Sequence, residues 1–272
     1  MIFNMWYNMS RVNSRHRKIQ LRDMDFLNCV VYIVYIERNV HYNMKAYVIL
    51  HGQTDFDAEG RIIGNSDPSL NDTGREQAKN AAEELKSKGI DMILSSPQLR
   101  TMETAEIIAD TLGFDKSKIT KGLKLYERAF GDLEGKLISE VDMFALSSWF
   151  GNAATPNGET VKDTANRVIA YMNNMVKIFR TKTMLLIVPE HVYKVLFWFF
   201  NGLPELGKEH EVKTDNCLIH EFDTENIPPE IKDYAPAADL PADDSGGGAD
   251  DASRLLSQSE IDALIADLMN SK

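Results

Sequence analysis

The chain has 272 residues, of which 43% are hydrophobic and 26% charged, so it can bury a large core and is not a disordered chain. Its formal charge is −11, and no Lys/Arg cluster alternates with aromatic residues, which excludes a nucleic-acid partner because phosphate neutralisation dominates such binding. The longest apolar run, Phe26 to Ile36, is about half the ~20 residues that a membrane span needs. We therefore expect no membrane segment.

The two cysteines, Cys29 and Cys217, predict neither a disulfide framework nor a structural zinc site. They form no CxxC pair and have no Cys/His spacing typical of metal ligands. We expect a cytoplasmic protein without a metal and without a cofactor.

The first 43 residues show no sustained helical or strand period before Val30. Their basic cluster lies too deep in the chain for a signal peptide. A regular strand-like run opens directly at Met44. We interpret residues 1–43 as an N-terminal extension outside the domain, or as sequence that precedes a true start at Met44.

Strands and helices alternate between residues 44 and 222. In chain order the pattern predicts a strand at 47–50, a helix at 75–88, a strand at 92–94, a helix at 101–112, a strand at 119–125, helices at 137–149 and 159–180, a strand at 184–188, a helix at 192–200 and a strand at 218–222. This alternation is typical of an α/β domain whose mostly parallel sheet is covered by helices on both faces.

The composition changes after residue 222. Residues 223–253 are rich in Pro, Gly and Asp, which predicts a flexible acidic linker. Residues 254–272 are predicted to form a helix that starts at a capping box of Ser257 and Glu260. The apolar stripe of this predicted amphipathic helix is Ile261, Leu264, Ile265 and Leu268.

Three chemically useful side chains follow three predicted strands. His51 follows the first, Arg100 follows the second within Ser95–Ile107, and Glu127 follows the third. Because ligands bind at the carboxyl ends of parallel strands, these residues could supply a nucleophile, an anion clamp and a proton donor.

Residues 46–222 resemble the histidine phosphatase superfamily, also called the phosphoglycerate mutase-like family. The resemblance rests on the segments 51–54, 60–64, 95–107, 127–135 and 156–160 in this order. It implies a three-layer α/β/α sandwich and a metal-free mechanism through a phosphohistidine. It makes His51 the nucleophile, Arg100 a phosphate clamp and Glu127 the proton donor, and it adds Gly52, Thr54 and Arg61 as substrate- or phosphate-binding residues.

This sequence departs from the family pattern at three positions. Leu50 stands where the first motif has Arg, Asp57 stands where Asn is usual, and Pro189 falls where the second phosphate-binding His belongs. His191 lies two residues further, roughly 6.5 Å away if the backbone is extended. His191 is therefore either a displaced phosphate ligand or a structural residue at the start of a helix, and the site is expected to be weakened.

Two classes of function remain open. The first is phosphomonoester hydrolysis, or mutase-type phosphoryl transfer, through His51, with a phosphorylated small molecule or a phosphoprotein as substrate. The second is a catalytically inactive phosphate-binding or adaptor module that docks a signalling partner.

The C-terminal helix bears on the second class. Residues 256–264 resemble the segment by which flagellar motor switch proteins bind a phosphorylated response regulator. This implies a receiver domain as partner, whereas an intramolecular contact with the chain's own domain is the alternative.

Overall fold

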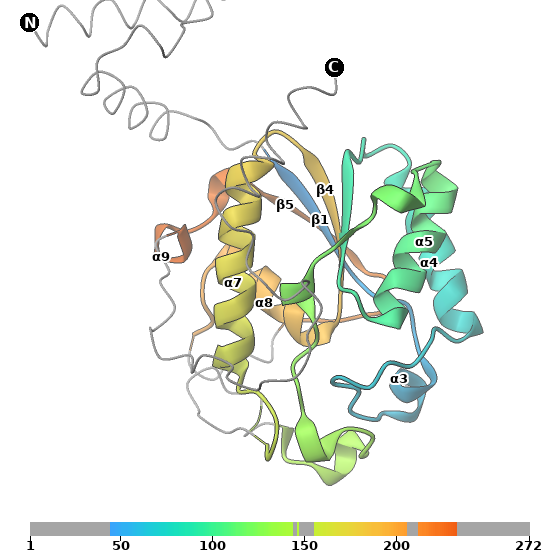
Figure 1. The fold of residues 1–272 in the computed structure, drawn as a ribbon, viewed down its shortest axis with the longest axis vertical. Helices are drawn as coiled ribbons and strands as arrows, with labels where there is room; N and C mark the ends of the chain where they lie inside the picture. The colour runs from blue at the N-terminus through green and yellow to red at the C-terminus, as the bar shows by residue number, and fades with distance from the viewer. Residues whose placement is uncertain (1–43, 144–145, 147–154, 206–211, 233–272) are drawn as a thin grey trace, which may run out of the picture. The chain divides into compact units, whose positions relative to one another are not determined.

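The computed structural model describes residues 44–143, 146, 155–205 and 212–232 (Figure 1). The predicted N-terminal extension, the linker from residue 233 onward and the docking helix with Ile261, Leu264, Ile265 and Leu268 lie outside the described residues. The described part begins with Met44, which is fully buried and bonded through its backbone to Thr224.

A five-stranded sheet forms the middle of the domain, in the order β3-β2-β4-β1-β5. The strands are β1 (Lys45–Leu50), β2 (Met92–Ser95), β3 (Thr120–Lys121), β4 (Thr183–Val188) and β5 (Ile219–Asp223). β1 pairs in parallel with β4 along its whole length, from Lys45 opposite Thr183 to Leu50 opposite Val188, and β5 covers the other edge of β1 in the antiparallel direction. The mostly parallel sheet is thus confirmed.

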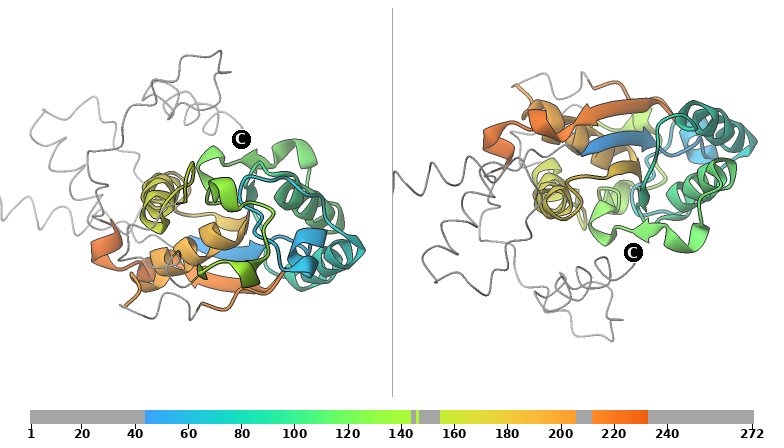
Figure 2. Two further views of the ribbon diagram at one scale, coloured as in Figure 1. Left: turned by 90° about the horizontal axis from the view of Figure 1, so that it is seen from below. Right: turned by 90° about the horizontal axis from the view of Figure 1, so that it is seen from above.

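Helices cover both faces of this sheet (Figure 2). Tyr47 and Ile49 of β1 pack against α4 (Asp72–Leu85) and α5 (Leu99–Leu112). Val48 and Leu50 point the opposite way, into the core formed with α7 (Val161–Ile178) and α8 (Glu190–Asn201). Successive side chains of a strand alternate between faces, so one apolar strand supplies both cores and the sandwich has three layers.

The domain continues beyond the predicted boundary at residue 222. A 3-10 turn, η7 (Thr224–Asn226), and the short helix α9 (Pro229–Lys232) follow β5. Ile227 and Ile231 are buried in the core, and the Asn173 side chain donates to the Ile231 carbonyl at 3.0 Å. The prediction that the flexible linker starts at residue 223 is therefore wrong, because two isoleucines in the Pro-rich stretch are enough to anchor it.

Some predicted elements are shorter than expected. The predicted strand 119–125 contributes only β3 to the sheet. Its partner β2 ends at Ser95, whose carbonyl accepts the last ladder hydrogen bond from the Gly122 N–H, and the chain then turns into η4 (Leu123–Leu125). The predicted helix 137–149 starts as η6 (Ile138–Glu140), because the preceding Leu137 forms a β-bridge with Arg61. No helix within the described residues is long and apolar enough to cross a bilayer.

Candidate active site

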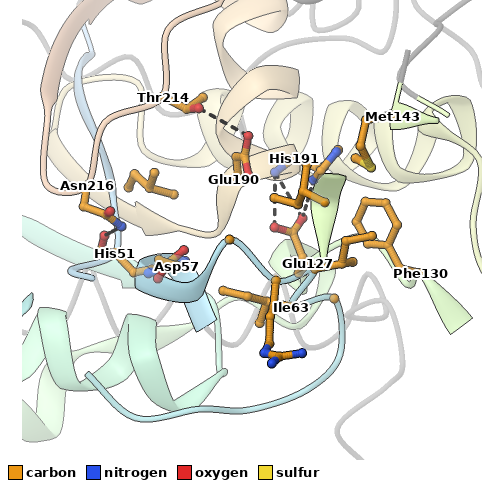
Figure 3. Close-up of a pocket in the computed structure, with 16 residues that line it drawn as sticks. His51, Asp57, Ile63, Glu127, Phe130, Met143, Glu190, His191, Thr214 and Asn216 are labelled. Atoms are coloured by element: carbon orange, nitrogen blue, oxygen red, sulfur yellow. Dashed lines mark hydrogen bonds and ion pairs between the residues drawn. The ribbon is translucent and has the colours of Figure 1, made fainter. Parts of the chain in front are cut away.

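A cavity of about 240 Å³ opens at the carboxyl ends of β1 and β4 (Figure 3). One part of its wall is formed by polar and ionisable side chains and the other by apolar ones. The polar and ionisable residues include His51, Asp57, Arg61, Glu127, Glu190, His191, Thr214 and Asn216, and the apolar ones Leu50, Ile62, Ile63, Phe130, Ile138 and Met143.

His51 directly follows β1 and is 2% exposed. Its backbone N–H donates to the Val188 carbonyl of β4 at 3.2 Å, and its own carbonyl accepts from Asn216 at 2.9 Å. The ring nitrogen Nδ1 lies 2.8 Å from the Gly52 carbonyl oxygen. Because a carbonyl can only accept, Nδ1 carries the proton and Nε2 presents a lone pair.

Arg100 faces that lone pair. It is fully buried in the first turn of α5, and its Nε donates to His51 Nε2 at 3.2 Å. Its two terminal nitrogens donate to the carbonyls of Ser66 and Gly64. Burial and, next, the positive charge of Arg100 lower the pKa of His51. The imidazole is therefore neutral, as a nucleophile requires.

Glu127 is buried at 5% exposure on the opposite side of the cavity from His51 (Figure 3). Its carboxylate accepts from the backbone N–H groups of Arg128 at 2.8 Å and of His191 at 3.1 Å. Burial alone would raise the pKa of Glu127. The charge and hydrogen bonding of His191, with Arg100 and the Arg128 N–H, outweigh burial and lower that pKa to about 2.

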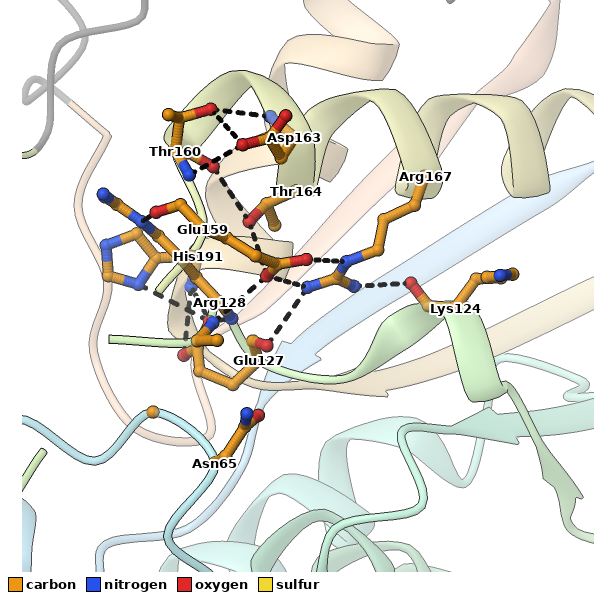
Figure 4. A network of polar contacts seen from close by, with 12 residues as sticks. Asn65, Lys124, Glu127, Arg128, Glu159, Thr160, Asp163, Thr164, Arg167 and His191 are labelled. Carbon is orange, nitrogen blue, oxygen red and sulfur yellow. Dashed lines mark hydrogen bonds and ion pairs between the residues drawn. The ribbon is translucent and has the colours of Figure 1, made fainter. Parts of the chain in front are cut away.

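The loop that carries Glu127 is held by a guanidinium (Figure 4). Arg167 of α7 binds both oxygens of Glu159 at 3.0 Å, and it also donates to the backbone carbonyls of Lys124 at 2.8 Å and Glu127 at 3.1 Å. Glu159 in turn accepts from the Ala129 N–H. No sequence motif predicts this role of Arg167. The one sequence signal for this contact is its partner Glu159, which belongs to the 156–160 segment.

The predicted phosphate-binding residues have different roles in the structure. Arg61 lines the cavity, with its guanidinium paired to Glu59 and the Gly135 carbonyl. Gly52 orients His51 through its carbonyl. Thr54 does not line the cavity, because its hydroxyl is engaged with Asp57 at 2.7 Å in the capping box of α3 (Asp55–Glu59).

The start of α8 differs from the expectation for Pro189 and His191. Pro189 is the N-cap of α8 and is not part of the cavity wall, whereas Glu190 and His191 both are. The backbone turns into a helix at Glu190, so the extended spacing of roughly 6.5 Å does not apply. His191 therefore lines the cavity. Its ring packs edge-on against Phe130 at 5.0 Å between centroids.

The cavity wall carries more acidic than basic side chains. Three carboxylates line it, those of Asp57, Glu127 and Glu190, and Leu50 adds no charge. Glu190 is neutralised by Lys194 at 2.7 Å and also accepts from Thr214 at 3.2 Å. Among the described residues, no group of three or more His, Cys, Asp and Glu side chains is arranged to hold a metal ion.

The family model of the histidine phosphatase superfamily (branch 1) matches residues 46–235. The chain belongs to this superfamily. The chain is 31% identical over 191 residues to a probable phosphoglycerate mutase of Proteus mirabilis, a match that covers 68% of this chain and 87% of that protein. It is 30% identical over the same length to the probable phosphoglycerate mutase of an Enterobacter strain, with the same coverage of both chains.

Solved structures of similar fold include YhfR of Bacillus stearothermophilus, at 25% identity and a TM-score of 0.57, covering 65% of this chain and 90% of that one. They also include a phosphoserine phosphatase of Entamoeba histolytica in complex with 3-phosphoglyceric acid, at 23% identity and a TM-score of 0.57. The latter match covers 70% of this chain and 99% of that one. These likenesses agree with the three-layer fold of this chain.

Proposed function

We propose that this histidine phosphatase hydrolyses a phosphomonoester, or transfers its phosphoryl group, through a phosphohistidine at His51 Nε2. The observation that carries the proposal is the fixed tautomer of His51. The Gly52 carbonyl holds the proton on Nδ1, and the Nε2 lone pair is directed at the guanidinium of Arg100.

In the proposed reaction, Nε2 attacks phosphorus while the bond to the leaving oxygen breaks. Arg100 stabilises the charge on the phosphoryl oxygens, since a guanidinium donates well-oriented, charge-assisted hydrogen bonds. A proton delivered at Glu127 neutralises the leaving alkoxide. Water then attacks the phosphohistidine and releases phosphate, or an acceptor alcohol does so in a mutase-type reaction.

Two features favour slow turnover. Leu50 offers no donor where the family motif has Arg, and three carboxylates face a substrate that is itself an anion. A hydrogen bond to a charged group contributes about 1.5–3 kcal/mol, so its absence alone corresponds to roughly 10- to 100-fold in rate.

The size of the cavity favours a small substrate. At about 240 Å³ it lies below the usual range for drug-sized ligands, which begins near ~300 Å³. A small phosphorylated metabolite fits this volume, and a phosphoprotein would enter only with its phosphorylated side chain.

Hydrolysis of 4-nitrophenyl phosphate by the wild-type protein and by His51→Ala tests the proposal. We expect His51→Ala to abolish turnover and the acid-labile, alkali-stable phosphoenzyme that the wild-type protein forms. His220→Gln is the matched control, because His220 lies on β5 outside the cavity wall. Equal rates for wild type and His51→Ala would refute the phosphohistidine mechanism.

The adaptor function and its receiver-domain partner remain a separate proposal that rests on the sequence of the C-terminal helix. Titrating the full chain and its Leu264→Asp variant against phosphorylated and unphosphorylated receiver domains tests it. Binding that Leu264→Asp removes would support it, and absence of binding to both forms would refute it.

A further inference from the structure

His191 contacts Glu127 twice. Its backbone N–H donates to both carboxylate oxygens, at 3.1 and 3.3 Å, and its ring nitrogen Nδ1 lies 3.5 Å from Oε1. In Figure 3 the ring lies on the side of Glu127 that faces Phe130 and Met143, whereas His51 lies on the other side. Glu127 and His191 thus contact each other within the wall of the cavity that His51 also lines.

The ring of His191 is otherwise unsatisfied. Both of its nitrogens are buried, and neither has a hydrogen-bond partner among the described residues. Buried polar atoms without a partner are rare in folded proteins and call for an explanation. The nearest carboxylate to Nδ1 is that of Glu127, at a distance that can shorten when substrate binds.

The charged surroundings of the pair come from several elements. Glu190 precedes His191 on α8, and Arg100 acts on Glu127 from α5. The Arg128 guanidinium lies 4.8 Å from the centroid of the Phe130 ring, whose other neighbour is the His191 ring. The closeness of His191, together with Arg100 and the Arg128 N–H, outweighs burial and lowers the pKa of Glu127.

An ionised Glu127 has no proton to give to the leaving oxygen. We propose that the proton is stored on His191 and reaches the leaving group through Glu127, so that the two side chains act as one acid. This inference rests on the proposed phosphohistidine mechanism. His191 is a positioning and proton-storing residue in it, and Glu127 is the group that touches the substrate.

The proton balance closes over one cycle. As the bond between phosphorus and the leaving oxygen breaks, Glu127 donates a proton to that oxygen and takes one from His191 Nδ1. The pair is then one proton short. When water attacks the phosphohistidine, its proton passes to Glu127 and back to His191, which restores the starting state.

Substrates with different leaving groups test the relay. A nitrophenolate leaves without protonation, whereas the alkoxide of glycerol phosphate needs a proton. We expect His191→Gln to lower turnover of glycerol phosphate by roughly 10²- to 10⁴-fold, the usual size of a general-acid contribution, and to lower turnover of 4-nitrophenyl phosphate less than tenfold.

The pH profile gives a second readout. Without His191, Glu127 must be protonated itself, so the decline of glycerol phosphate turnover on the alkaline side is expected to move to lower pH. His220→Gln, on β5, serves as the control with an unchanged profile. Equal losses on both substrates together with an unmoved alkaline limb would overturn the relay.

Two outcomes separate this inference from the proposed function. If His51→Ala turns over both substrates at the wild-type rate, the phosphohistidine mechanism is refuted. If His51→Ala abolishes turnover of both substrates, and the loss of turnover in His191→Gln does not depend on the leaving group, only the proton relay is refuted.

A measurement without turnover covers the case in which His191→Gln does not fold. The ring ¹⁵N signals of His191 are followed by NMR in the full chain, in wild type and in Glu127→Gln. If Glu127 and His191 share a proton, Glu127→Gln should shift the ring ¹⁵N signals of the neighbouring His191. Unchanged His191 signals would contradict the proposal.

Discussion

Arg100 and His51 meet through their Nε atoms at 3.2 Å, so the clamp donates to the same lone pair that is expected to attack phosphorus. A bound phosphate would offer the guanidinium an anionic acceptor in place of the neutral imidazole, and charge-assisted hydrogen bonds are the stronger ones. In the proposed reaction, substrate binding would therefore free Nε2 of His51 for attack, because Arg100 would exchange one acceptor for another.

Arg100→Gln should lower turnover of 4-nitrophenyl phosphate by roughly 10²- to 10³-fold, the usual effect of removing one donor from a developing oxyanion. It should also raise the pKa of His51, since the charge of Arg100 is the main lowering influence after burial. Steady-state kinetics and an NMR titration of His51 measure the two effects. Arg75→Gln is the control, because Arg75 is a partly exposed arginine paired with Glu103 outside the cavity wall. An unshifted His51 titration in Arg100→Gln would contradict the assignment.

Stability should depend on pH through His51. Its pKa is lowered in the folded state, so the unfolded chain binds more protons once the pH falls below about 6.5. The free energy of unfolding should therefore fall as the pH is lowered from 7.5 to 5.5, and this loss should be smaller in His51→Gln. Urea denaturation at the two pH values measures it. A residual slope is expected in the variant, because burial also lowers the pKa of His220. Identical slopes in both proteins would refute the prediction.

Glu127 should contribute stability in a different pH window. A pKa lowered to about 2 means that this contribution is complete above about 4.5 and is lost as the pH falls toward 2. The shift corresponds to on the order of 3 kcal/mol. Glu127→Gln should be less stable than wild type at pH 6 by an amount of this order, and the difference should shrink in acid. A gap that stays constant from pH 6 to pH 3 would speak against an ionised Glu127.

Leu50→Arg should raise turnover and lower stability together. Leu50 is 4% exposed, belongs to the core against α7 and α8, and also lines the cavity. An arginine there would face the carboxylates and could bind phosphate, with an expected gain of roughly 10- to 100-fold in turnover and tighter binding of vanadate. Loss of the buried leucine should cost about 1.5–3 kcal/mol. Leu50→Met is the control for the change of shape. If Leu50→Arg folds and turnover does not rise, the missing arginine is not what slows the site.

Gly52→Ala should disturb the nucleophile through its backbone. A Cβ at Gly52 would collide with the backbone carbonyl of Gly74, which lies directly against it. We expect a loss of about 1–3 kcal/mol in stability, together with reduced turnover because the Gly52 carbonyl orients the His51 ring. Gly89→Ala is the control, because a Cβ at Gly89 would enter open space. Since Gly89 has a φ of +63°, this substitution should lower stability only through backbone strain. Normal turnover in Gly52→Ala would show that the ring tolerates the shift.

Periodicity was sufficient for the elements that bury continuous apolar surface. β1 and β4 each have six residues, of which the last five are apolar. The predicted helix 159–180 corresponds closely to α7 at Val161–Ile178. Periodicity was insufficient where the length of a strand depends on its partner, as in β3, which stops after two residues because β2 ends at Ser95.

The site shows the same division. His51, Arg100 and Glu127 follow from strand ends and motifs, because His51 directly follows β1, Arg100 lies in the first turn of the helix after β2, and Glu127 follows the turn η4. The placement of His191 did not follow, since the distance from Pro189 depends on whether the backbone is extended or helical, and α8 begins two residues earlier than the predicted helix at 192. Arg167 lies in the middle of a helix, and nothing in the sequence links it to a carbonyl forty residues earlier.

Heating would act unevenly on the two halves of the site. His51 is bonded through its backbone to β4 in the middle of the sheet. Glu127 sits on an irregular loop that is bonded to α7 through the Arg167 guanidinium and to α8 through the His191 N–H. Irregular segments open locally at lower free energy than central strands. Warming should therefore release Glu127 from the site before His51. Turnover of 4-nitrophenyl phosphate should then persist at temperatures at which turnover of alkyl phosphates is already lost.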